Sequence, residues 1–260
     1  IGAVFGPGPG VLGSVAEPLK SSHLKPLLAG EIQGAFGFTE ADDSAPTTAV
    51  KDGEHWVING HKSYVTGGQH ADFINTLARI PDSGPAMIVI DTKTPGVEIE
   101  RAFGSLDGSQ HAAFKFTNVR VPLDHIIGKP GEGLPRAMRQ IGDVRLLLGA
   151  LCVGYMRWVD DYLTSHLKQT DRTGKPRGDK EGVRIRYADN RIKTYAARSM
   201  VYRTARLADS GANVVNEAIA CKVFATEAVG DVVDTAIQLV GGNALITGHP
   251  LESLYRRVRA

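Results

Sequence analysis

The sequence predicts an α+β protein with three parts: the end of an N-terminal helical domain (residues 1–34), a middle antiparallel β-barrel or sandwich domain (35–128) and a C-terminal helical bundle (129–260). Two patterns predict this fold class. Apolar and polar residues alternate between turn dipeptides in the middle of the chain, which is typical of strands, and apolar residues recur at helical spacing in the last half. A chain of 260 residues can bury a substantial hydrophobic core.

The first part is predicted to contain only short helices. Between Pro7 and Glu31, the prolines at positions 18 and 26 limit each helix to a few turns, because proline removes a backbone donor and clashes with the preceding turn. The sequence begins with Ile1 and shows no signal-peptide pattern. We therefore expect the natural N-terminus to lie upstream.

Two dipeptides in the middle domain predict hairpins, because Asp-Gly and Asn-Gly tolerate the positive φ angles of type I′ turns. Asp52-Gly53 separates the predicted strands TTAVK and EHWVI, and Asn59-Gly60 separates EHWVI from HKSYVT. Further strands are predicted at FINTLAR, AMIVI, VEIER and AAFKFTNV. About seven short strands of this kind make an antiparallel barrel or sandwich.

Four helices are predicted in the last part. They start near Pro135, at Val183, after Asn213 as N-cap and near Pro250, and the third ends before Gly241-Gly242. This third helix is apolar on more than one face, which predicts a central position in the bundle. The first two are expected to bury one stripe each: Met138, Ile141, Leu148, Cys152, Tyr155, Val159 and Tyr162 in the first, and Ile185, Ala188, Ile192, Ala196, Met200 and Leu207 in the second.

The composition excludes several classes of protein. Hydrophobic residues make up 42% and charged residues 22%, as in ordinary globular proteins. The longest uncharged apolar run, residues 146–156, is too short for a membrane span. Cys152 and Cys221 have no cysteine or histidine cluster around them, so we expect neither a disulfide nor a metal site, and a reducing compartment.

Positive charge is concentrated between Lys168 and Arg206, where twelve Lys and Arg residues face four Asp and Glu residues. Such a stretch is either a solvated helix face or a site that attracts phosphate groups. No zinc-finger pattern or aromatic stacking platform accompanies it, so we expect no nucleic-acid partner. A nucleotide-type cofactor fits these cations as well. The common dinucleotide, NTPase, serine-hydrolase and zincin motifs are absent.

Three segments resemble one family in order and spacing: GEIQGAFGFTEADDSAPTTAVKDGEHWVINGHKSYVTGG, FTNVRVPLDHIIGKPGEG and AIQLVGGNALITGHPLESLYR. Together they are similar to the acyl-CoA dehydrogenases, a family of flavoproteins, and the resemblance covers nearly the whole chain. It implies the three-part architecture predicted above and FAD as cofactor.

The resemblance also implies roles for individual residues. The strand that ends in Thr39 would lie along the flavin, an aromatic ring at Tyr64 would back it, and Thr66 would reach its N5 atom. Arg172 matches an arginine that reaches the cofactor of a neighbouring subunit. The full set of expected cofactor contacts is Phe36, Phe38, Thr39, Ser44, Tyr64, Val65, Thr66, Arg172, Gln238, Gly241 and Gly242.

The implied reaction is α,β-dehydrogenation of an acyl-CoA thioester, in which a glutamate removes the α-proton and hydride passes to flavin N5. Ile141 and Arg145 would lie near the acyl-CoA. In most members of the family the glutamate base follows the segment that matches LYRRVRA, so it is expected beyond Ala260. A minority carry it just before the arginine of the first bundle helix, but that position is Val144 here and Asp143 lies one residue earlier. The resemblance further implies an electron-transfer flavoprotein as acceptor, a homo- or hetero-oligomer (dimer or tetramer), and a bacterial cytoplasmic or mitochondrial matrix location.

Departures from the family pattern leave a second function open. The usual Gly-Ser-Asp is shortened to Asp43-Ser44-Ala45-Pro46, with Ser44 or Thr47 as substitutes for the phosphate-binding serine. The usual phenylalanine is missing after Arg172, and Glu181 stands where glutamine is common. The alternatives are therefore a non-catalytic or half-site subunit of a heteromeric complex that binds FAD weakly or not at all, or a relative with different chemistry such as nitroalkane oxidation.

Overall fold

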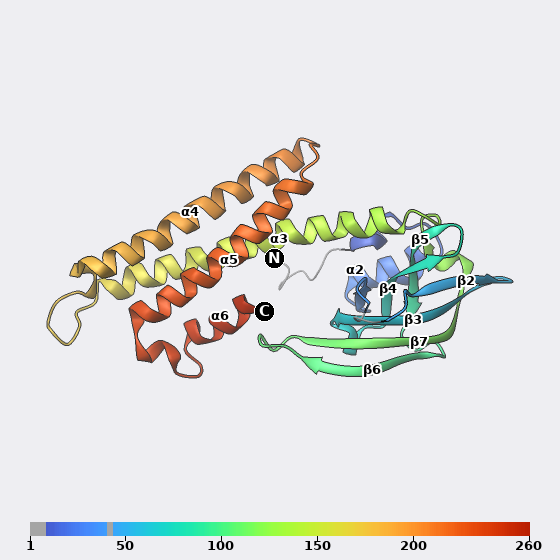
Figure 1. Cartoon of the computed structure of the whole chain (residues 1–260), viewed down its shortest axis with the longest axis horizontal. Helices are drawn as coiled ribbons and strands as arrows, with labels where there is room; N and C mark the ends of the chain where they lie inside the picture. The colour runs from blue at the N-terminus through green and yellow to red at the C-terminus, as the bar shows by residue number, and fades with distance from the viewer. Residues whose placement is uncertain (1–8, 41–43) are drawn as a thin grey trace. The chain divides into compact units, whose positions relative to one another are not determined.

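The computed structural model describes residues 9–40 and 44–260 (Figure 1). Pro7 and Gly8, at the start of the predicted helical segment, and Asp43 lie outside the described residues. The chain divides into two compact units, residues 1–140 and 141–260. The first holds the sheet and the second the helical bundle, which confirms the α+β class.

The N-terminal segment consists of short helices, as predicted: the 3-10 helix η1 (Gly10–Ser14), the π-helical turn η2 (Lys20–Leu24) and α2 (Lys25–Ala29). Val11, Leu12 and Leu19 are buried and share a cluster with Phe73 and Met87 of the sheet. The segment therefore covers part of one face of the sheet.

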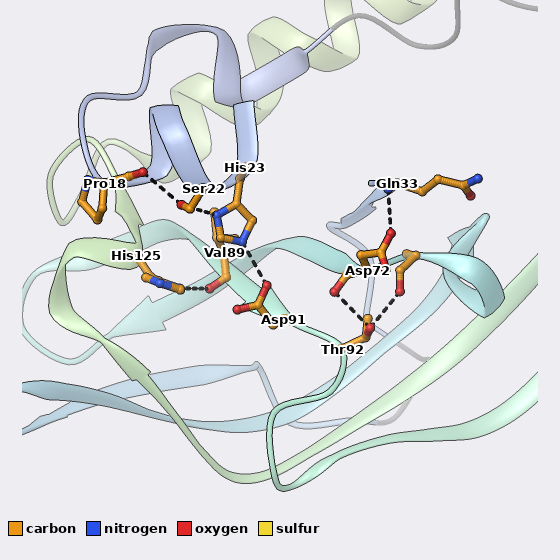
Figure 2. A network of polar contacts seen from close by, with 10 residues as sticks. Pro18, Ser22, His23, Gln33, Asp72, Val89, Asp91, Thr92 and His125 are labelled. Carbon is orange, nitrogen blue, oxygen red and sulfur yellow. Dashed lines mark hydrogen bonds and ion pairs between the residues drawn. The ribbon is translucent and has the colours of Figure 1, made fainter. Parts of the chain in front are cut away.

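A polar network also joins this segment to the sheet (Figure 2). Ser22 Oγ donates to Pro18 O and lies 2.8 Å from Nδ1 of the buried His23. On the other side of the ring, His23 Nε2 lies 2.9 Å from Asp91 Oδ1. This contact holds the pKa of Asp91 below its ordinary value, because the hydrogen bond from His23 stabilises the carboxylate more than partial burial destabilises it.

Eight strands form one sheet in the described part of the chain, and β6-β7-β3-β2-β4-β5-β8 is its order, with β1 attached to β4. The path does not close, so the sheet is open rather than a closed barrel. β1 and β2 both pair with β4 in parallel, which corrects the expectation of a purely antiparallel domain. The strands are β1 (Gly34–Gly37), β2 (Thr48–Asp52), β3 (His55–Thr66), β4 (Phe73–Ile80), β5 (Gly84–Asp91), β6 (Val97–Gly104), β7 (Gln110–Pro122) and β8 (Ile126–Ile127).

The two predicted hairpins have different outcomes. β2 and β3 do form a hairpin, with Asp52 paired to His55 and Gly53 at φ 58°. The turn predicted at Asn59-Gly60 is wrong, because β3 continues through it as a strand with a bulge opposite β7. Gly60 is needed there for close approach: a Cβ atom on it would lie 2.6 Å from Thr47 Cα.

The bundle contains α3 (Gly133–Leu167), α4 (Glu181–Asp209), α5 (Val215–Val240) and α6 (Pro250–Arg259), all close to their predicted positions. The N-cap of α5 is Val214 rather than the predicted Asn213, whose Oδ1 accepts from the amide of Val215. Gly241 at the end of α5 has φ 89°. α5 is central, as predicted. Its buried residues are Ala218, Cys221, Ala225, Ala228, Val229, Val232, Val233, Ala236, Leu239 and Val240.

The predicted buried stripes of α3 and α4 are partly wrong. On α3, Cys152 and Val159 are buried but Met138 and Leu148 are exposed. On α4, Ile185 and Ile192 are 57% and 65% exposed. α4 instead packs a more polar face on α5, because the buried Asn190 donates to Val232 O at 3.1 Å. The buried residues of α4 are Asn190, Thr194, Ala197, Val201 and Thr204.

The sequence predicted neither a membrane span nor a disulfide. No helix of residues 9–40 and 44–260 is long and apolar enough to cross a bilayer. Cys152 and Cys221 are both buried, with free thiols.

Candidate functional site

In the first unit, the end of β1 lies beside the last part of β3. The amide of Ser63 donates to Thr39 O at 3.0 Å, and Lys62 Nζ donates to Phe38 O at 3.0 Å. The structure therefore brings Thr39 next to the strand segment that carries Tyr64, Val65 and Thr66. Thr39 is 25 to 27 positions from these three residues in the sequence, and only the resemblance had connected them.

The last part of β3 presents alternate side chains to opposite sides. Val65 is 1% exposed, whereas Tyr64 is 63% exposed and Thr66 is also exposed. Tyr64 lies in a bulge between Lys62 and Val65 and has φ 60°. A left-handed backbone at a residue other than glycine costs about 1–3 kcal/mol and is often found at functional sites.

Two aromatic residues that the sequence analysis missed surround these side chains. The ring of Phe103 on β6 meets Tyr64 edge to face, with centroids 5.7 Å apart. His111 on β7 stacks on Phe103 and places Nδ1 3.1 Å from Thr66 Oγ1. No local pattern around these residues pointed to them, because only strand pairing brings β6 and β7 alongside β3.

The other predicted residues of this segment, Phe36 in β1 and Phe38 directly after the strand, are partly buried. Phe36 and Phe38 stack on one another with centroids 5.9 Å apart, and both pack against the core cluster under the N-terminal segment. Thr39 is exposed. The structure therefore places Thr39, rather than the two rings, on the accessible side of this strand end.

Lys62 is buried beneath this strand end, with 1% of its side chain exposed. Its Nζ lies 2.9 Å from Glu40 Oε1, and the same oxygen accepts from the amide of Thr47 at 2.8 Å. Burial lowers the pKa of Lys62 because it disfavours the charged form, and Glu40 only partly offsets this effect. Burial works to raise the pKa of Glu40, but the hydrogen bonds from Lys62 and Thr47 outweigh it and hold that pKa below its ordinary value.

The two substitutes for the missing phosphate-binding serine differ. Ser44 is half-buried. Thr47 is 1% exposed, and its hydroxyl donates to His61 O at 3.1 Å. The hydroxyl of Thr47 is thus occupied inside the fold.

In the second unit, a pocket of about 450 Å³ lies at the end of α5. Arg177 donates from Nη1 to Val240 O at 3.2 Å and to Leu239 O at 3.4 Å. Gln238 also lines the pocket, and Gly241 directly follows Val240, the last residue of α5. The lining residues are Arg177, Lys180, Gly182, Val183, Arg186, Gln238 and Leu239.

The charge of this pocket suits an anion. Three of its lining residues are cationic, and none is acidic. Lys180 lies on the rim and pairs with Asp171 at 2.8 Å, which holds the pKa of Asp171 well below its ordinary value. Arg172, the predicted cofactor residue, is exposed in the preceding turn and is not part of the lining. Arg177 was missed, although the density of cations in this segment was a signal.

The predicted substrate residues lie near the start of the second unit. Ile141 and Arg145 are both half-buried on α3, and their spacing of four places them on the same face of the helix. Asp143 is exposed between them. The structure thus forms two groups of candidate residues, one around Thr39 and Thr66 and one around Gln238.

The comparisons with known proteins converge on one family. Residues 35–119 match "Acyl-CoA dehydrogenase, middle domain" and residues 131–260 match "Acyl-CoA dehydrogenase, C-terminal domain". The chain is 31% identical to an acyl-CoA dehydrogenase of Bacillus subtilis, over 92% of this chain and 66% of the relative. It is 30% identical to an acryloyl-CoA reductase (NADH) of Anaerotignum propionicum, over 91% of this chain and 64% of the relative.

Solved structures agree. The crystal structure of a putative acyl-CoA dehydrogenase from Mycobacterium smegmatis matches with a TM-score of 0.89 and 28% identity, over 98% of this chain and 70% of that chain. The chain spans slightly less than two thirds of the length of the two curated relatives.

Proposed function

Because the chain belongs to the acyl-CoA dehydrogenase family, we propose that the whole protein oxidises an acyl-CoA thioester by α,β-dehydrogenation, with FAD as its cofactor. The observation that carries the proposal is the pairing of Thr39 O with the amide of Ser63. This contact holds Thr39 beside the part of β3 that carries Tyr64 and Thr66, three of the residues that the resemblance assigns to the flavin.

The residues present fit a flavin nucleotide. A flavin needs hydrogen-bond donors for its polar ring edge and an apolar surface for its face. Thr39 offers an exposed hydroxyl, and Tyr64 an exposed ring. Bound FAD supplies the acceptor for the hydride from the β-carbon, and the protein supplies orientation and electrostatics.

The pocket at the end of α5 fits the phosphate and adenosine part of an FAD molecule. Arg177 and Lys180 suit phosphate oxygens by charge. Gln238 offers an amide, and Gly241 lets a ligand approach the backbone closely because it has no side chain. In an oligomer, this pocket would serve FAD bound by a neighbouring subunit.

We assign substrate binding to Ile141 and Arg145, which share a face of α3. The base that removes the α-proton is placed in a glutamate after Ala260. An electron-transfer flavoprotein is proposed as the acceptor, in the bacterial cytoplasm or the mitochondrial matrix. Exposed apolar side chains on α4 support an oligomer: Ile185, Ile192, Tyr195 and Tyr202.

A second candidate is a half-site subunit that binds FAD weakly or not at all. The buried, occupied hydroxyl of Thr47 favours it, because one of the two possible replacements for a phosphate contact is not available. The position of Arg172 outside the pocket also favours it.

The visible absorbance of the purified full-length protein distinguishes the two candidates. We expect the oxidised flavin bands before or after addition of FAD, and their bleaching by acyl-CoA thioesters without oxygen. A protein that stays colourless with excess FAD contradicts the dehydrogenase proposal for this chain alone. If it gains colour and activity only after mixing with a paralogous subunit, it is a half-site subunit.

A further inference from the structure

Lys62 is the buried charge nearest to the proposed flavin site. It is among the largest fully buried side chains of the described residues. Its stem packs under β1, where a Cβ atom on Gly37 would lie 3.4 Å from Lys62 Cγ. A buried ammonium is unfavourable unless acceptors surround it, so its partners indicate why a lysine stands here.

The partners lie on both sides of Thr39. Nζ donates to the backbone oxygen of Phe38 at 3.0 Å and to the carboxylate of Glu40 at 2.9 Å. The residue between them, Thr39, accepts from the amide of Ser63, the residue after the lysine. Three consecutive residues of one segment are thus held by two consecutive residues of another.

The same contacts extend to one further segment and lie next to the bulge of β3. Glu40 Oε1 also accepts from the amide of Thr47, which leads into β2. Lys62 is the last paired residue of β3 before the bulge in which Tyr64 has φ 60°. The ammonium therefore lies where the exposed residues of β1 and those of β3 are fixed relative to one another.

We propose that Lys62 and Glu40 form a clamp that positions Thr39 and the Tyr64–Thr66 segment for the flavin. Both are positioning residues, since they act through the two strand ends. The inference rests on the proposed function for its ligand, whereas the clamp itself is a property of the chain. Rigid support of this kind matters because small displacements of binding groups lose much of their interaction energy.

The test compares three variants of the full-length protein. Lys62→Met keeps the buried stem and removes the ammonium. Glu40→Gln keeps an oxygen that can accept from Lys62 and from the amide of Thr47, but removes the charge. Val121→Ala is the control, because Val121 is 2% exposed and lies opposite Trp56, at the other end of β3.

We expect Lys62→Met to weaken FAD binding by about tenfold or more and Glu40→Gln to weaken it less. Val121→Ala should lower the melting temperature but leave FAD binding nearly unchanged. In the FAD-free protein, hydrogen exchange at the amides of Ser63 and Thr47 should be about tenfold faster in Lys62→Met than in Val121→Ala. The reduction potential of the bound flavin should shift only in the clamp variants.

Equal FAD affinity of Lys62→Met and Val121→Ala overturns the inference. If Lys62→Met does not fold, Glu40→Gln decides, and an affinity equal to that of Val121→Ala overturns it. A wild-type protein that takes up no FAD contradicts the proposed function instead. The exchange rates of Ser63 and Thr47 then decide alone, and unchanged rates in the clamp variants overturn the clamp.

Discussion

Arg177 donates to the backbone oxygen of Val240 at 3.2 Å and so caps the C-terminal end of α5 from the turn that precedes α4. A cation at this end of a helix stabilises it, because the last carbonyl groups carry partial negative charge. The same side chain lines the cationic pocket beside Gln238. Arg177 thus both stabilises the end of α5 and contributes positive charge to a candidate phosphate site.

Arg177→Gln should therefore change two measured quantities. We expect the free energy of unfolding to fall by about 1 kcal/mol and FAD binding to weaken by about tenfold. Chemical denaturation and FAD titration of the full-length protein check these values. Arg172→Gln is the comparison, and if it weakens FAD binding more than Arg177→Gln does, the phosphate contact comes from the exposed turn.

Gly60→Ala should destabilise the first unit by more than about 2 kcal/mol. The new Cβ atom would lie 2.6 Å from Thr47 Cα, and the backbone there cannot move without disturbing β2. Gly53→Ala is the control, since Gly53 also has a positive φ but has nothing within 4 Å. Similar melting temperatures for the two variants would show that the close approach of Gly60 to Thr47 does not determine the stability of the first unit.

Ile192→Glu should reduce the mass of the assembled protein without unfolding it. Ile192 is 65% exposed, so a charge there costs the isolated chain little, but it would disrupt the apolar contact between subunits proposed above. Sedimentation velocity and circular dichroism measure the two effects. Asn190→Ala is the matched variant on the buried side of α4, and it should lower the free energy of unfolding by about 1–3 kcal/mol. An unchanged mass for Ile192→Glu argues against this face as an interface.

Asp91→Asn should destabilise the first unit at neutral pH and have little effect in acid. The folded-state pKa of Asp91 is lowered through its contact with His23. Its stabilisation is therefore fully present above the unfolded pKa, about 3.9, and is lost as the pH falls through the lower folded pKa. The carboxylate is half exposed, so we expect less than about 1 kcal/mol. Denaturation between pH 3 and 6 tests this, and a difference from wild type that grows in acid contradicts it.

The sequence was sufficient for features with local causes. Asp52-Gly53 forms a turn, and Gly241 ends α5 with φ 89°. Both follow from the conformational freedom of glycine. The family resemblance connected Thr39 with Thr66, and in the structure the backbone hydrogen bond from Ser63 to Thr39 O holds the segment after β1 beside the last part of β3.

Features that depend on partners distant in the chain could not be predicted. Asn59-Gly60 looks like a turn, but Gly60 serves a close approach by Thr47. Ile185 and Ile192 look like core, but α4 packs its Asn190 face on α5 because that amide finds a backbone acceptor. The many cations around Arg177 pointed to its segment but not to this residue, whose contact is with the end of α5. His111 carried no local signal, since its contact is with Thr66 on the neighbouring strand β3.

The left-handed backbone at Tyr64 has a consequence for engineering the protein. Glycine adopts φ 60° without strain, so Tyr64→Gly should raise the free energy of unfolding of the sheet unit by about 1 kcal/mol. The exposed ring of Tyr64 contributes little packing beyond its contact with Phe103, so its loss costs little. If Tyr64→Gly is more stable than the wild type but binds FAD more weakly, the strained backbone at Tyr64 lowers stability in order to present the ring at the proposed site. If the variant is less stable, the ring itself stabilises the fold.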